Sequence, residues 1–358
     1  MEKKNILIIF GGCSPEHNVS LESAAAVISH MDREKYLPVT VGITREGDWY
    51  WYQGPAEAIA EGRWQEDKGV KKAFLSPSRR EKALLVLDGA ALKSIPIHAA
   101  FPVLHGKNGE DGTVQGLIEL AGIPLIGCGV LASALCMDKD RAHRLAGIAK
   151  VKVPASYVVE RGFEERAALA RAESLGYPLF VKPVRAGSSF GVTRVAERTE
   201  LLDALYLALL YDGQALMEEA IPGFEVGCAV MDAGDRLLIG EVDEIELAGG
   251  FFDYTEKYGL ISSKIHVPAR IPPETANRIK DSAGRIYRAL GCSGFARVDL
   301  FLTPDGEIVF NEVNTIPGFT AHSRFPGMMR AAGIPFEELI DRIIEGTLKK
   351  NEAEGKIG

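Results

Sequence analysis

The chain has 358 residues, 46% of them hydrophobic and 25% charged, which is typical of a globular protein of about two or three domains. Its formal net charge of −8 offers no basic footprint, so we expect no nucleic-acid partner. The longest apolar tract, at residues 125–137, is broken by glycine and too short for a bilayer, so we expect no membrane association. Five scattered cysteines without a CxxC pair indicate buried thiols in a reducing compartment. The short apolar run after Met1–Lys4 is a strand and not a signal peptide, so we expect a cytoplasmic enzyme.

Residues 1–132 predict an N-terminal α/β domain of the Rossmann type. The continuous apolar run at 5–10 is typical of a buried parallel strand, and Gly11-Gly12 turns it toward a helix. The GxGxxG motif of dinucleotide-binding domains is missing. Glu16 at this turn either binds a ligand cation or is a solvated first-turn carboxylate that interacts favourably with the helix dipole. His105 follows another apolar strand, at the sheet edge where α/β proteins bind ligands, although a lone histidine is more often structural. We predict strands at 37–43, 49–52, 99–104 and 123–127, helices at 20–31 and 113–121, and an excursion at 64–80, which is charged and poorly periodic.

Residues 133–222 predict a central domain in which lysines and a glycine–serine loop stand out. Lys182 closes an apolar strand, so it should be buried and should need an anionic partner. The loop at 185–192 supplies N–H groups and hydroxyls suited to covering phosphates, although a plain hairpin turn is an even alternative. Lys139, on a helix of mixed charge, would be unremarkable alone.

Residues 223–350 predict a C-terminal domain. Glu218 ends one strand and Glu225 begins the next, so both could point into an interdomain cleft and accept bonds from a nucleotide. The aperiodic stretch 249–264, rich in aromatic residues and glycine, is a candidate lid. We also predict a strand at 237–247, an amphipathic helix at 274–290 and closing helices at 327–348.

A β-hairpin at 295–313 carries the strongest chemical signal. Its two strands flank a Thr-Pro-Asp-Gly turn. Because side chains in a strand repeat every two residues, Arg297 and Asp299 share one face of the first strand. Glu312 and Asn314 likewise share one face of the second strand. Pairing brings Asp299 directly or diagonally opposite Glu312. Two carboxylates and a carboxamide are ligands that suit Mg²⁺ beside phosphates. The alternative is an amphipathic hairpin with a solvated acidic face.

Five motifs resemble the D-alanine–D-alanine ligase family of ATP-grasp enzymes, in family order and over nearly the whole chain. They are VLHGKNGEDGTVQG at 103–116, SALCMDKDRAH at 133–143, YPLFVKPVRAGSSFGV at 177–192, FFDYTEKY at 251–258 and GFARVDLF…EIVFNEVNTIPGFTAHS at 294–323. The resemblance implies three α/β domains, with ATP held between the sheets of the central and C-terminal domains. It also implies peptide-bond formation through a D-alanyl phosphate, peptidoglycan as the destination, and a homodimer.

The resemblance assigns a role to each matching residue. For the metal, two Mg²⁺ ions (or Mn²⁺) would lie on Asp299, Glu312 and Asn314. For the nucleotide, the residues would be Lys139, Lys182, Ser189, Glu218, Glu225 and Lys257. For the first D-alanine, they would be Glu16, Ser188, Tyr258 and His105. Arg297 and the Gly318 amide would form the oxyanion hole, and Ser323 would face the second substrate's carboxylate.

The second substrate is assigned by finer departures from the family pattern. Tyr258 matches ligases that use an amine nucleophile, which disfavours D-lactate. Arg324 and the sequence VDEIEL…GGFFDYTEKY resemble vancomycin-resistance ligases of the VanG type, which make D-alanyl-D-serine. Asp243 and Arg324, with Phe252 shaping the wall, are plausible partners for a serine hydroxyl. D-alanine is the alternative; another ATP-grasp ligase and a non-catalytic nucleotide-binding regulator are the rival classes.

Overall fold

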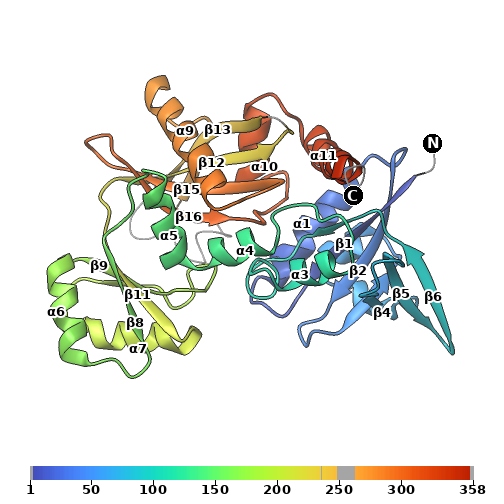
Figure 1. The fold of residues 1–358 in the computed structure, drawn as a ribbon, viewed down its shortest axis with the longest axis horizontal. Coiled ribbons are helices and arrows are strands. Elements are labelled where there is room, and N and C mark those ends of the chain that lie inside the picture. Colours follow the sequence, from blue (N-terminus) through green and yellow to red (C-terminus); the bar gives the residue numbers. More distant parts are fainter. Residues whose placement is uncertain (1–2, 235, 248–262, 355–358) are drawn as a thin grey trace.

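The computed structural model describes residues 3–234, 236–247 and 263–354. Within these ranges the strands form three sheets, and each sheet draws on one part of the chain (Figure 1). The α/β prediction is confirmed. The helices and strands lie in Figure 1 in three groups, the N-terminal one in blue, the central one in green and yellow, and the C-terminal one in yellow to orange.

The first sheet has the order β6-β5-β4-β3-β2-β1-β7. Only β1, β2 and β7 run parallel, because β3 to β6 are added as antiparallel neighbours. The strands are β1 (Lys4–Gly11), β2 (Tyr36–Ile43), β3 (Trp49–Tyr52), β4 (Lys71–Leu75), β5 (Ala83–Asp88), β6 (Ala91–Pro96) and β7 (Ala99–Pro102). The helices are α1 (His17–His30), α2 (Ala56–Ala60), η1 (Trp64–Glu66) and α3 (Thr113–Leu120).

Three sequence predictions for this part are wrong. The predicted excursion at 64–80 contains β4, and Trp64 is buried under the sheet against Phe10, because its aromatic area outweighs the charge around it. Residues 123–127 form no strand but a single bridge, between Ala100 and Leu125. Cys13 is exposed, unlike the buried thiols expected.

The second sheet has the order β10-β9-β11-β8, and α6 and α7 pack on it. Its elements are β8 (Ser156–Glu160), α6 (Glu165–Leu175), β9 (Leu179–Pro183), β10 (Thr193–Val195), η2 (Arg198–Glu200), α7 (Leu201–Tyr211) and β11 (Gln214–Glu219).

The third sheet has the order β14-β13-β12-β15-β16, and α9 and α10 pack against it. Its elements are β12 (Phe224–Asp232), β13 (Leu237–Leu247), β14 (Ser263–His266), α9 (Pro273–Ala289), β15 (Phe295–Leu302), β16 (Ile308–Asn314), α10 (Arg324–Ala331) and α11 (Phe336–Glu354).

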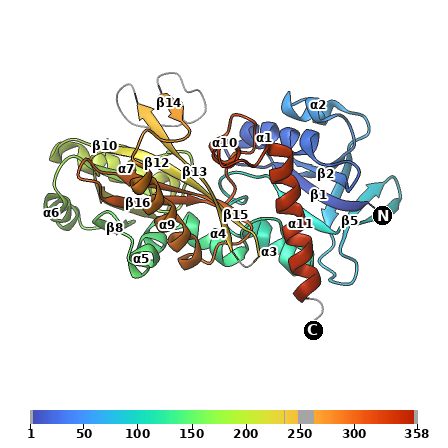
Figure 2. The ribbon, with the colours of Figure 1, turned by 90° about the horizontal axis from the view of Figure 1, so that it is seen from above.

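Two sets of helices connect these groups. The helices α4 (Val130–Met137) and α5 (Lys139–Ile148) contact β16, and α5 also contacts α9, so both lie against the third sheet although the domain prediction begins the central part at residue 133. At the other end, α11 runs beside α1 (Figure 2) and contributes its apolar residues to the core of the first sheet. The C-terminal end of the chain therefore covers the N-terminal sheet.

Candidate active site

The hairpin β15–β16 has the register that alternation predicts. Asp299 is the direct partner of Glu312, and Arg297 is the direct partner of Asn314, with a register shift just after Asp299. The predicted convergence of four polar side chains on one surface is confirmed. Asp299 is almost fully buried, whereas Glu312 is partly exposed.

Arg297 binds two of the three predicted metal ligands. Its Nε lies 2.9 Å from Asp299 Oδ1, and its Nη2 lies 2.7 Å from Oδ2. The Asn314 amide, oriented to satisfy both of its ends, accepts from Arg297 Nη2 at 3.0 Å and donates to Glu110 Oε1 at 2.7 Å. Burial opposes ionisation of Asp299, yet Arg297 and Arg324 keep the pKa of that carboxyl below its usual range.

These oxygens fit a hard divalent cation by chemistry. Among the described residues no group of three or more His, Cys, Asp or Glu side chains is arranged for a metal ion. The set at the hairpin has a different composition, two carboxylates and one carboxamide, which is a common environment for Mg²⁺ that keeps some of its waters. A cation would compete with Arg297 for Asp299.

Arg324 is the second buried arginine, and three carboxylates surround it. Its Nε and Nη2 bind Asp243 at 2.7 and 2.8 Å, and its Nη1 binds Glu225 at 3.0 Å. Nη2 also lies 3.3 Å from Asp299 Oδ1. Burial lowers the pKa of this guanidinium, but the carboxylates, Asp243 first, outweigh burial and raise it. The sequence analysis assigned Asp243, Glu225 and Arg324 to ligands and missed that Arg324 binds both carboxylates.

A cavity of about 510 Å³ lies between the second and third sheets. Lys182 is buried in its wall and donates to Glu218 Oε1 at 2.8 Å, which confirms the expectation that this lysine has an anionic partner. Lys139 donates to the Ala186 carbonyl at 2.7 Å and lies 4.0 Å from Glu312. Every predicted nucleotide residue that the structure describes lines this cavity: Lys139, Lys182, Ser189, Glu218 and Glu225.

The loop between β9 and β10 contains strained backbone. Ser188 and Ser189 have φ of +50° and +59°, in the left-handed region that non-glycine residues rarely occupy. Strained backbone of this kind persists only where surrounding contacts hold it in place, and it is frequently found at ligand-binding sites. Ser188 Oγ donates to Glu16 Oε1, so the loop is tied to the residue that follows the first sheet's β1 turn.

A second cavity, of about 380 Å³, brings together residues from all three parts of the chain. His105 lies in it and bonds the Ile316 carbonyl through Nδ1 at 2.9 Å; burial lowers its pKa. Ser323 Oγ accepts from the Thr320 amide at 3.0 Å. The predicted residues that line this cavity are Glu16, His105, Lys139, Ser188, Arg297, Glu312, Asn314, Gly318, Ser323 and Arg324. Asp243 is fully buried behind it, against Arg324.

Glu110 is a residue of this cavity that sequence reasoning missed. It is buried, and its Oε2 accepts from the Gly106 amide at 2.7 Å. Burial, and then the nearby Glu16, raise the pKa of Glu110 to about 8. Its position inside the glycine-rich run 106–112, directly after His105, was the available signal.

Three predicted residues, Phe252, Lys257 and Tyr258, lie outside the described residues, as does most of the predicted lid.

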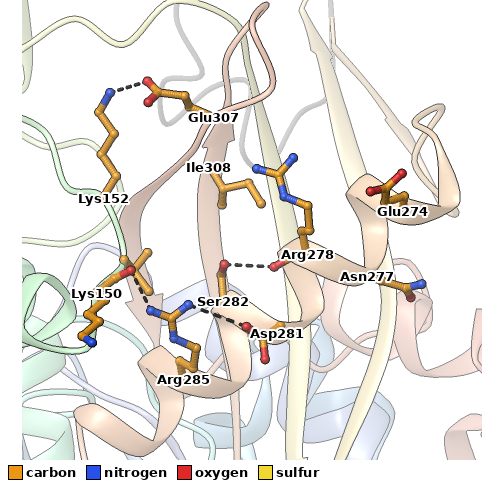
Figure 3. A pocket seen from close by; sticks show the side chains of 11 residues that line it. Lys150, Lys152, Glu274, Asn277, Arg278, Asp281, Ser282, Arg285, Glu307 and Ile308 are labelled. Carbon is orange, nitrogen blue, oxygen red and sulfur yellow. Dashed lines mark hydrogen bonds and ion pairs between the residues drawn. The ribbon is translucent and has the colours of Figure 1, made fainter.

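A surface groove of about 810 Å³ lies elsewhere, between α9, the β15–β16 turn and the segment after α5 (Figure 3). Three of its cations are bonded within or beside it: Lys152 to Glu307, Arg278 to the Gly306 carbonyl at 3.0 Å, and Arg285 to the Ala149 carbonyl at 3.2 Å. Because these three cations already have protein partners, we assign no ligand to this groove.

Comparison with known proteins decides the class. Residues 5–128 match the family model described as D-ala D-ala ligase N-terminus, and residues 146–345 match D-ala D-ala ligase C-terminus. The chain belongs to the D-alanine–D-alanine ligase family. It is therefore an ATP-dependent ligase of the D-alanine–D-X class with the ATP-grasp fold, as the motifs predicted.

The relatives of this ligase differ in the functions that their names give them. The crystal structure of the VanG D-Ala:D-Ser ligase from Enterococcus faecalis is 54% identical with a TM-score of 0.90, covering 97% of this chain and 100% of that one. The vancomycin B-type resistance protein VanB of Enterococcus faecalis is 47% identical, over 96% of this chain and 98% of its own. A D-alanine–D-alanine ligase of Caldicellulosiruptor bescii is 43% identical, over 100% of this chain and 98% of its own.

No helix in the described residues has the length and apolar character needed to span a membrane.

Proposed function

We propose that this ligase joins D-alanine to D-serine, with ATP converted to ADP and phosphate, and that D-alanyl phosphate is the intermediate. One observation carries the proposal: the two cavities adjoin. Both are lined by Lys139, Ala186, Gly187, Ser188 and Glu312. A phosphate at the end of one cavity is therefore next to an amino acid in the other, and phosphoryl transfer depends chiefly on such positioning and on neutralised charge.

The nucleotide lies, in this proposal, in the cavity of about 510 Å³. Lys139 and Lys182 neutralise phosphate charge, Ser189 covers the phosphates, and Glu218 and Glu225 accept from the base and the ribose; Lys257 would join them from outside the described residues. Mg²⁺ or Mn²⁺ on Asp299, Glu312 and Asn314 would supply charge neutralisation at the phosphates.

The first D-alanine lies in the other cavity. Glu16, held by Ser188, accepts from the substrate ammonium, and His105 lies beside it. Tyr258, outside the described residues, would join Glu16. Arg297 and the Gly318 amide would stabilise the oxyanion when the second amine attacks. Because Arg297 is bonded to Asp299 and Asn314 here, its guanidinium becomes available only when those oxygens have another partner.

D-serine as the second substrate is supported by the 54% identity to a D-Ala:D-Ser ligase and by Arg324 at the cavity wall. The serine hydroxyl needs a hydrogen-bond partner, and the Arg324–Asp243 pair provides polar groups that an aliphatic side chain at position 324 would not. Phe252, outside the described residues, would shape the wall beside them. D-alanine in both positions, in the service of ordinary cell-wall synthesis, is the alternative; a D-alanine–D-serine product fits a role in vancomycin resistance.

The test is phosphate release by the purified protein with ATP and magnesium, given D-alanine alone, D-alanine with D-serine, or D-alanine with D-lactate. We expect kcat/KM for D-serine to exceed that for a second D-alanine by roughly tenfold or more, because a site built for a hydroxyl discriminates against its loss. Mass spectrometry identifies the product, and EDTA should abolish turnover. Faster joining of two D-alanines would refute the serine assignment; no turnover under any condition would refute the function.

A further inference from the structure

His143 is a buried histidine to which the reaction described above gives no role. It lies on α5, packed edge-on against the ring of Phe310, with 3% of its surface exposed. Its Nε2 lies 2.9 Å from the Asn311 carbonyl oxygen. A carbonyl only accepts, so Nε2 carries the proton and, in the neutral ring, Nδ1 is left with a lone pair.

That lone pair faces a carboxylate oxygen in the wall of the nucleotide cavity. Glu218 Oε1 is bound by Lys182, but Glu218 Oε2 and His143 Nδ1 are buried without a hydrogen-bond partner among the described residues. The two atoms are 3.8 Å apart. Two acceptors facing each other leave a buried carboxylate oxygen without a donor, which costs free energy until a donor arrives.

The charges around His143 favour its neutral form. Burial lowers the pKa of the ring below its ordinary 6.5; Glu218 on β11 raises it, and Lys182 on β9 and Lys139 on α5 lower it. Of the other neighbours, α4 offers only the thiol of Cys136, β16 carries Glu312 beside Lys139, and Arg285 on α9 is bonded to the carbonyl of Ala149 at the end of α5. At neutral pH the ring therefore has no proton to give to Glu218.

We propose that His143 is a positioning residue for nucleotide selection: its neutral ring keeps Glu218 Oε2 free of a protein donor, so that the 6-amino group of the purine fills that place. Protonated, His143 would donate to Oε2 itself and compete with the amino group. This inference rests on the proposed function, in which Glu218 accepts from the base. It makes the preference for ATP over a purine without the amino group dependent on the charge of His143.

The experiment compares ATP with purine riboside triphosphate, which has hydrogen in place of the 6-amino group. KM for each nucleotide is measured from pH 8.0 to 5.5 at saturating amino acids. The two triphosphates titrate alike, so the ratio of KM values isolates the amino group. For the wild type we expect a preference for ATP of roughly tenfold or more at pH 8.0, typical of a bond to a charged acceptor. Below the pKa of His143 this preference should decline toward unity, because the competent fraction falls about tenfold for each further pH unit.

His143→Gln is the matched variant. Its side-chain amide can still donate to the Asn311 carbonyl, but it does not titrate, so its preference for ATP should stay flat across the same pH range. A wild-type preference that is independent of pH, or a variant that declines like the wild type, would overturn the role of His143. These outcomes differ from failure of the proposed function, in which no turnover occurs or ATP is never preferred. The wild-type series decides the matter even where the variant fails to fold.

Discussion

Glu110 shows how one buried side chain couples pH to stability. Its carboxyl has a pKa of about 8 in the folded ligand-free protein, raised by burial and by Glu16, against an ordinary 4.5 when exposed. The folded state therefore binds a proton more tightly than the unfolded state does. Stability should fall as pH rises from 4.5 through 8, because in that window the unfolded state has already released this proton.

Glu110→Gln removes this dependence. We subtract the free energy of unfolding of the wild type from that of the variant at each pH. This difference should be larger at pH 9 than at pH 5 by at least about 1 kcal/mol, because only the wild type loses stability as Glu110 ionises. Urea unfolding without ligands, followed by circular dichroism at several pH values, measures the difference. Glu57→Gln, at an exposed position on α2, is the control and should show no such trend. An unchanged difference for Glu110→Gln would show that the carboxyl is ionised in the folded protein.

Sequence reasoning succeeds for single residues where a local pattern fixes their surroundings. Asp299 and Glu312 follow from alternation in a hairpin, and buried Lys182 from its place at the end of an apolar strand. The bonds of Arg324 to Asp243 and Glu225 could not be predicted, because they join three separate elements. Glu110 and His143 escaped notice because burial of a polar side chain leaves no local pattern.

At the scale of elements, strand β12 shows why a glycine is needed in a central strand. Gly227 pairs with Asp243 on one side and with Asp299 on the other. A Cβ at Gly227 would lie 2.3 Å from Arg324 Nη2 and 2.6 Å from Asp243 Oδ1. The missing side chain is therefore the space that the guanidinium of Arg324 occupies.

Gly227→Ala should displace Arg324 from its carboxylates. We expect a loss of about 1 to 3 kcal/mol in the free energy of unfolding, typical of overpacking, and a fall in kcat/KM, because Asp299 and Glu225 lose a partner. Thermal unfolding and the phosphate-release assay measure the two effects. Gly213→Ala is the control, since a Cβ there would meet nothing within 4 Å. Equal behaviour of the two variants would contradict the packing argument.

Element prediction failed where strands lack alternation. β5 and β6 form a hairpin that sequence analysis did not predict, although Asp88-Gly89 is a recognised turn signal. β6 is exposed along nearly its whole length, so it shows no apolar period. The hairpin of β15 and β16 was predictable because residues 295–302 alternate and a Thr-Pro-Asp-Gly turn follows them directly.

At the scale of the whole molecule, the site depends on parts far apart in sequence. The turn between β1 and α1 supplies Glu16, and the segment after β7 supplies His105. The loop after β9 supplies Ser188, and the third sheet supplies Arg297 and Asn314 to the same cavity. α11 returns to pack against α1 and β7, which fixes the N-terminal sheet beside the C-terminal one (Figure 2). The resemblance of the five motifs to the family predicted that these parts form one site. The hydrophobic pattern alone could not predict it, because the contacts join residues far apart in the sequence.

The bond from Ser188 to Glu16 is the link across 172 positions that should make two parts act together. A double-mutant cycle with Glu16→Gln and Ser188→Ala tests it through kcat/KM for D-alanine. We expect the double variant to lose less than the sum of the single losses by at least about 1 kcal/mol, since either change alone breaks the shared contact. The control cycle pairs Glu16→Gln with Lys152→Ala, in the distant groove of Figure 3, and should be additive within about 0.5 kcal/mol. Additivity in both cycles would mean that the loop and the N-terminal sheet bind the substrate independently.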